Sequence, residues 1–211
     1  VTSFNRAAEE ITGVSRLDDM MFGGLPAGSN SLLYGPPFMG KQVLLNLFVA
    51  DGLKRGIPAI YVVIDKSPAE VRNSLRPILH NVEAFEEKGL LHWVDAYSRG
   101  MGLPEEGGNV RHVELDGLTE AIMETQEELG GVHHKLAFHS ISTLLTYNDA
   151  KTTFRFLQNL TARSRWTNSV ALYTMDAGMQ SDGDVATLKH LMNGMLEFKQ
   201  EDLKTYLRVE G

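Results

Sequence analysis

The feature that most constrains this chain is the segment GPPFMGKQ at residues 35–42. Its outer frame, G-x-x-x-x-G-K, is that of a phosphate-binding loop, in which a strand, a tight turn and a helix N-terminus direct backbone N–H groups at anionic oxygens. Residues 31–34 predict the strand, and a helix is expected from about Lys41. The eight residues alone fit a Gly-Pro turn before a helix equally well. The candidate phosphate-binding residues are Gly35, Pro36, Pro37, Phe38, Met39, Gly40, Lys41 and Gln42.

Short apolar runs alternate with helical stretches along the rest of the chain, a pattern that predicts an α/β domain with a mostly parallel central sheet flanked by helices. The run AIYVVI at 59–64 is typical of a strand buried on both faces. Further strands are expected at 31–34, 90–94, 136–138 and 170–174, before a closing antiparallel hairpin of 196–199 and 206–209. Helices are expected at 43–53, from the capping box SPAE (67–70) to Pro77, at 118–129, at 150–164, and at 185–192 before Gly194.

Residues 98–117 between these elements show neither a helical nor a strand period and are rich in glycine and proline. A connection of this length is usually functional or disordered. We expect it to be an irregular loop and the most mobile part of the domain, because ordering its glycines has a high entropic cost.

The length and composition fit one globular domain, which we place at residues 11–211 after an N-terminal extension at 1–10. The formal net charge of −7 and scattered basic residues argue against a nucleic-acid surface, and acidic pairs such as Glu9-Glu10 are expected to be solvated. The sequence has no cysteine, no secretory signal and no apolar run long enough for a membrane span, so we expect a cytoplasmic protein. Because the chain opens at Val1, we expect a processed protein or a domain of a longer one.

The residues that flank the loop decide its interpretation. The segment ITGVSRLDDMMFGGLPAGSNSLLYGPPFMGK, residues 11–41, closely resembles the start of RecA-like ATPases of the KaiC family. The features in the order and spacing of that family are Thr12-Gly13, Leu17-Asp18, Gly23-Gly24-Leu25-Pro26 and Gly28. Similar segments continue at 52–71, 86–98 and 135–145, so the resemblance covers nearly the whole chain.

The resemblance implies a RecA-like P-loop fold, ATP and Mg²⁺ as ligands, and a role among archaeal signalling and clock-like proteins. The resemblance also identifies the positions at which this chain departs from the family pattern. Gln42 stands where the family has a Thr or Ser that coordinates Mg²⁺, and Phe38 stands at a turn position usually given to Gly. His139 takes the place of the Asp that ends the Walker B strand, although Ser140 follows it as expected. Asp65-Lys66 replaces the pair of catalytic Glu residues.

These four departures affect separate parts of one site. Mg²⁺ requires well-placed oxygen ligands, and phosphoryl transfer depends on positioning and electrostatic stabilisation. We therefore predict a catalytically degenerate ATPase domain with weak or absent binding of ATP and Mg²⁺, acting as a regulatory or signalling interaction module. Asp65 is the candidate catalytic residue for the alternative, an active ATPase with an atypical Mg²⁺ site.

The expected partner is a second copy of the chain or another protein, with neither nucleic acid nor membrane involved. A zinc site of His139 with His133 and His134 is a further alternative, but solvated or core histidines are the usual case and we assign no metal ligand.

Overall fold

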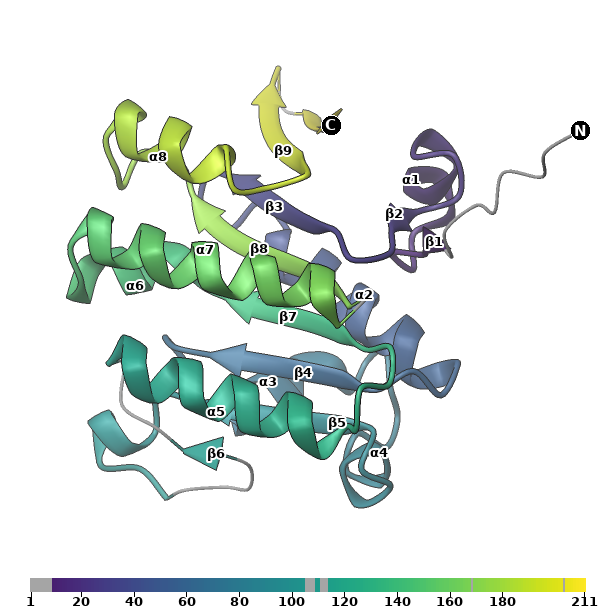
Figure 1. Ribbon diagram of the computed structural model, residues 1–211. Coiled ribbons are helices and arrows are strands. Elements are labelled where there is room, and N and C mark those ends of the chain that lie inside the picture. Colours follow the sequence, from purple (N-terminus) through teal and green to yellow (C-terminus); the bar gives the residue numbers. More distant parts are fainter. Residues whose placement is uncertain (1–8, 105–108, 111–113, 168, 203) are drawn as a thin grey trace, which may run out of the picture.

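The computed structural model describes residues 9–104, 109–110, 114–167, 169–202 and 204–211. Within them, the main sheet has eight strands in the order β10-β9-β3-β8-β7-β4-β5-β6 (Figure 1). All neighbours are parallel except β9 and β10, which form the predicted antiparallel hairpin. The strands are β3 (Asn30–Gly35), β4 (Ala59–Val63), β5 (Leu91–Asp95), β6 (Asn109–Val110), β7 (Lys135–His139), β8 (Val170–Asp176), β9 (Gly194–Glu201) and β10 (Lys204–Glu210). The predicted α/β class and the mostly parallel sheet are confirmed.

Helices cover both faces of the sheet (Figure 1). They include α2 (Lys41–Lys54), α3 (Pro68–Leu75), α5 (Leu115–Glu128), α7 (Ala150–Trp166) and α8 (Asp182–Lys189). Strand β4 shows how the core is divided, because every one of its residues is buried. Ile60 and Val62 pack in the cluster that contains α5 and α7, whereas Tyr61 and Val63 pack in the cluster that contains α2 and α3. A continuously apolar strand is therefore satisfied on both of its faces.

The capping box SPAE opens α3 as predicted. The Ser67 side chain accepts a hydrogen bond from the Glu70 N–H, and the Glu70 carboxylate accepts one from the Ser67 N–H. The helix ends at Leu75, two residues before Pro77.

The helix predicted at 185–192 is shifted toward the N-terminus. Helix α8 begins at Asp182 because the Ser181 hydroxyl accepts a hydrogen bond from the Asp184 N–H at 3.2 Å, and it ends at Lys189. Gly194 does not stop this helix; it opens β9. The polar cap residues before position 185 were the missed signal.

The prediction that residues 98–117 form an irregular loop is wrong in part. The short helix η1 (Arg99–Met101) lies in it, β6 pairs with β5, and α5 starts at Leu115. Residues 105–108 and 111–113 lie outside the described residues, and the expected mobility stays a prediction. Other elements too short to show a period were also missed: β1 (Glu9–Glu10), α1 (Ser15–Met20), β2 (Leu25–Pro26), α4 (Glu83–Glu87) and α6 (Ile141–Tyr147).

The two strands β1 and β2 form a separate antiparallel ribbon before the main sheet. Glu10 in this ribbon is buried, so the expectation that the Glu9-Glu10 pair is solvated is wrong for Glu10. Its carboxylate contacts Arg55, His133 and Lys135, which compensate its charge. Residues 1–8 of the predicted N-terminal extension lie outside the described residues.

In the described part of the chain, none of the helices combines the length and the apolar character that crossing a membrane requires.

Candidate functional site

The GPPFMGKQ segment connects the end of β3 to the start of α2 at the carboxyl edge of the parallel strands. Gly40 is the N-cap residue of α2 and has a φ of 95°, which glycine adopts without steric penalty. Gly35 is required for a different reason. A Cβ at this position would lie 2.6 Å from the Phe198 carbonyl oxygen on β9. The loop therefore has the strand–turn–helix geometry that the sequence predicted.

Phe38 occupies the turn with a φ of 62°, in the left-handed region that side chains other than glycine rarely adopt. Its ring is fully exposed, with a relative accessibility of 105%. The ring thus gains no burial that would offset the backbone strain. The turn position that the family usually gives to Gly therefore has the positive φ that favours glycine.

The Lys41 ammonium group is occupied by partners within the protein. The side chain is buried, and its Nζ donates to the Gly35 carbonyl oxygen at 2.7 Å. It also forms an ion pair of 2.8 Å with Oδ1 of Asp176, the last residue of β8. Asp176 was not among the predicted site residues, although it lies two residues beyond the predicted strand 170–174 and parallel strands align their carboxyl ends.

The Gln42 side chain is held by a second lysine. Lys66 Nζ, just beyond the end of β4, donates a hydrogen bond of 2.8 Å to Gln42 Oε1. Two of the four departures from the family pattern therefore contact each other. The amide oxygen that stands at the Mg²⁺-ligand position already binds a cationic group.

Asp65, the other residue of the replaced catalytic pair, contacts a third departure, His139. His139 Nε2 lies 3.4 Å from Asp65 Oδ1, and its Nδ1 forms a 2.6 Å hydrogen bond with the Thr174 hydroxyl. Burial by itself would raise the Asp65 pKa, but the hydrogen bond from His139, its charge and that of Lys66 together hold this pKa below its usual range. Asp65 is thus kept ionised and paired, which weakens it as a proton acceptor.

The donor set does not fit Mg²⁺. Magnesium requires octahedral oxygen ligands, whereas Gln42 is engaged with Lys66 and His139 supplies nitrogen in place of a carboxylate. Among the described residues, no group of three or more His, Asp or Glu side chains could hold a metal ion. The zinc alternative is also excluded for the three histidines together, because His133 and His134 precede β7 and His139 ends it.

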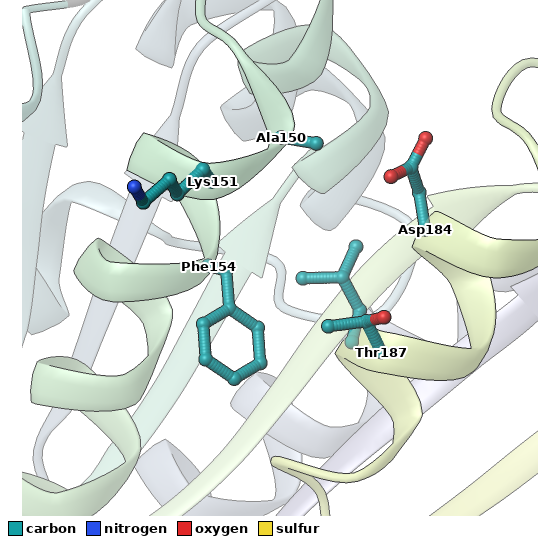
Figure 2. A pocket seen from close by; sticks show the side chains of 6 residues that line it. Ala150, Lys151, Phe154, Asp184 and Thr187 are labelled. Carbon is teal, nitrogen blue, oxygen red and sulfur yellow. The ribbon is translucent and has the colours of Figure 1, made fainter.

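Four surface pockets, of about 350, 310, 270 and 210 Å³, lie elsewhere. The largest of these four lies between α7 and α8, with Phe154 and Thr187 on its walls (Figure 2). None of the four is lined by residues 35–42, Asp65 or His139. The phosphate loop is thus not part of any of these four pockets. This agrees with the contacts at the site, where the side chains bond to one another.

Comparisons with known proteins point to one family. The family profile described as the KaiC ATPase matches residues 11–209. A UPF0273 protein of Pyrococcus horikoshii is 31% identical over 134 residues, which are 63% of this chain and 54% of the relative. A UPF0273 protein of Methanopyrus kandleri is 35% identical over 95 residues, covering 45% of this chain and 38% of the relative. The chain thus spans about half the length, or less, of these relatives.

A solved structure supports the same fold. The crystal structure of a KaiC-like protein from Pyrococcus horikoshii superposes with a TM-score of 0.74 and covers 96% of this chain and 87% of that chain. At 16% sequence identity, this likeness concerns the fold alone.

Proposed function

This chain belongs to the KaiC ATPase family, and from that premise we propose that it is a catalytically degenerate member, with weak or absent nucleotide binding, that acts as a regulatory or signalling interaction module. The proposal includes assembly with a second copy of the chain or with another protein. The fold would then serve as a scaffold for contacts, because fold and catalytic function are separable.

The observation that carries the proposal is the pairing of Lys41 with Asp176. In a working phosphate loop this lysine reaches the β- and γ-phosphates. Here a carboxylate of the same chain pairs with the ammonium group at 2.8 Å, and the Gly35 carbonyl oxygen accepts a hydrogen bond from it. A phosphate must displace these partners before it can bind.

The lost catalytic groups support the same proposal. Removal of a single group that stabilises the transition state typically lowers the rate by on the order of 10²–10³. Gln42, Lys66 and His139 each replace such a group, and all three bond within the protein. Several losses at one site leave hydrolysis with little of its electrostatic support.

The alternative is an active ATPase in which Asp65 serves as the general base of an atypical metal site. It is favoured by one observation, the partly exposed and ionised Asp65 carboxylate at the end of β4. The contact with His139 argues against it, because a base must be free to reach the attacking water.

Steady-state phosphate release from ATP with Mg²⁺ distinguishes the degenerate module from the active ATPase. We expect the parent protein to release phosphate no faster than a Lys41→Ala variant. Release well above that background, abolished by Lys41→Ala, would establish the active enzyme and refute the degenerate one.

A further inference from the structure

Strand β10 forms one edge of the main sheet, and within the described ranges only β9 pairs with it. An edge strand presents a row of N–H and C=O groups that can pair with another strand, and proteins usually protect it with prolines, bulges or a short length. Strand β10 has seven residues, contains no proline, and pairs with β9 in an unbroken register. Its charged side chains therefore decide which strand can pair with its outer side.

The register of the hairpin determines which backbone groups of β10 face outward. In an antiparallel ladder, successive residues direct their N–H and C=O groups alternately to the two neighbouring strands. Glu201 and Lys204 close a two-residue connection and so form a hydrogen-bonded pair. The Glu210 carbonyl oxygen fits this phase, because it lies 3.1 Å from the place where a Cβ on Gly194 of β9 would be. The outward backbone groups are therefore those of Thr205, Leu207 and Val209.

The charges of β10 are complementary to those of a second, antiparallel copy of the strand. Lys204 begins the strand and Glu210 ends it. Arg208 lies on the same face of the sheet as Glu210, since the two form an ion pair of 3.0 Å. When two copies align antiparallel about Leu207, Lys204 lies opposite Glu210 of the other copy. Tyr206, which is 47% exposed, lies opposite Arg208 of the other copy, and a cation over an aromatic ring is attractive.

We propose that β10 pairs with β10 of a second copy of the chain, antiparallel about Leu207, and forms a two-fold symmetric dimer. The pairing joins the two main sheets into one and uses the outward backbone groups of both strands. The proposal names the partner of the interaction module proposed above.

Other registers bring like charges together. Outward groups must face outward groups, so the register changes in steps of two residues. A step in one direction places Lys204 opposite Arg208 of the other copy, and a step in the other direction places Arg208 opposite itself. In the proposed register, Arg208 lies only diagonal to its copy, and the ion pair with Glu210 offsets this repulsion.

The other face of β10 is apolar. Leu207 and Val209 are partly buried there against the core cluster that contains α2. In the dimer Leu207 lies opposite its copy and Thr205 lies opposite Val209 of the other copy, and both are favourable cross-strand pairs. A surface pocket of about 310 Å³, lined by Phe22 and Val209 among others, adjoins this face, and Phe22 is 85% exposed. Apolar surface thus lies next to the interface.

The experiment is sedimentation velocity of the full chain at concentrations from about 1 to 500 μM, since one strand pair is a small interface and a weak dimer is expected. We expect Thr205→Pro to abolish dimerisation, because proline removes an outward N–H, and proline is tolerated where an edge N–H faces solvent. Thr205→Ala is the matched control, because it keeps the N–H and should dimerise like the parent.

A charge exchange between copies tests the register. Lys204→Glu and Glu210→Lys each place like charges opposite one another in their own dimers, and each should weaken dimerisation by roughly tenfold. A mixture of the two variants restores both opposite-charge pairs in the mixed dimer, which should form as well as the parent dimer. Lys54→Glu, at an exposed lysine of α2, makes the same charge change away from the strand and should have no effect.

Three results would overturn the proposal. A parent protein that stays monomeric throughout the series excludes the dimer, and it leaves the degenerate site standing because phosphate release is measured separately. A dimer that persists in Thr205→Pro forms through another surface. A mixture of Lys204→Glu and Glu210→Lys that dimerises no better than either variant alone contradicts the antiparallel register.

Discussion

The amino ends and the carboxyl ends of the parallel strands form opposite edges of the central sheet, the amino edge and the carboxyl edge. Each of these edges holds a buried lysine, and the two lysines differ in how easily their partners can be replaced. Lys135, at the start of β7, has a side chain that is 0% exposed, and its Nζ bonds to two backbone carbonyls and to Asp51, with Glu10 at 3.5 Å. Lys41, at the opposite edge, is 6% exposed and pairs with Asp176, which is 30% exposed. A buried cation whose partners are also buried stabilises the fold, because its loss leaves buried charges unpaired. A buried cation whose partner is partly exposed can exchange that partner for another anion.

The largest effect is expected at the amino edge. Lys135→Met removes the ammonium and leaves Glu10 and Asp51 without it in a buried network, a loss that typically costs about 3–5 kcal/mol. We expect urea denaturation to show a decrease of this size in the free energy of unfolding. Lys41→Met should lose clearly less, because Asp176 can turn toward solvent. Equal losses for the two variants would contradict the distinction between the edges.

The second prediction concerns a triple variant that carries better Mg²⁺ ligands at the carboxyl edge. Gln42→Thr, Lys66→Glu and His139→Asp together supply a hydroxyl and two carboxylates, which suit Mg²⁺ better than an amide, an ammonium and an imidazole. We expect Mg²⁺ to increase the ATP affinity of this variant by roughly a hundredfold, the upper range for shells that support a metal. Calorimetry with and without Mg²⁺ measures the change.

Thermal unfolding of the same triple variant is the control, since the three positions lie at the sheet edge rather than in the core clusters. A folded triple variant whose ATP affinity does not respond to Mg²⁺ would refute the assignment of these positions as the reason for the poor metal fit.

A pH titration tests the amino edge by a second route. Burial would raise the Glu10 pKa, but hydrogen bonds from His133 and Arg55 and the charge of Lys135 lower it from 4.5 to about 2. Because the folded-state pKa lies below the unfolded one, the contribution to stability is complete above pH 4.5 and is lost as the pH falls toward 2. Its size at neutral pH is on the order of 2–3 kcal/mol.

Glu10→Gln serves as the comparison for this titration. The difference in unfolding free energy between parent and variant should be constant near neutrality and should shrink through the acid range. A difference that does not depend on pH would mean that Glu10 has the same pKa in the folded and unfolded states.

The sequence predicted more of the fold than of the site, for a physical reason. Strand β4 and helix α3 were found because a continuous apolar run and a capping box are local properties of neighbouring residues. The pairings Lys41–Asp176 and Lys66–Gln42 were not found, because they join elements that are distant in sequence. The altered positions were visible one by one, but only the structure brings them together in pairs.

The fourth prediction concerns exchange at Lys41. Asp176→Asn removes the charge that competes with an anion, while the amide oxygen can still accept a hydrogen bond from the ammonium. We expect the ATP affinity measured without Mg²⁺ to rise by roughly tenfold, with little change in unfolding free energy. Asp184→Asn, in the first turn of α8, is the control for a general change of charge. An equal gain in both variants would attribute the effect to net charge.

The smallest effect is expected from Phe38→Gly in the phosphate loop. A residue other than glycine in the left-handed region costs about 1–2 kcal/mol, and the fully exposed ring recovers none of this by burial. Glycine removes this strain but loses about 0.5–1 kcal/mol more conformational entropy on folding. The two terms largely offset each other, so we expect the free energy of unfolding to rise by roughly 0–1.5 kcal/mol. Phe38→Ala separates the causes, because it removes the ring and keeps the strain. Urea denaturation should therefore find Phe38→Ala equal to the parent and Phe38→Gly at or slightly above it. A clear loss of stability in both variants would show that the ring packs against the protein, and exposure of Phe38 would then be the wrong description of the loop.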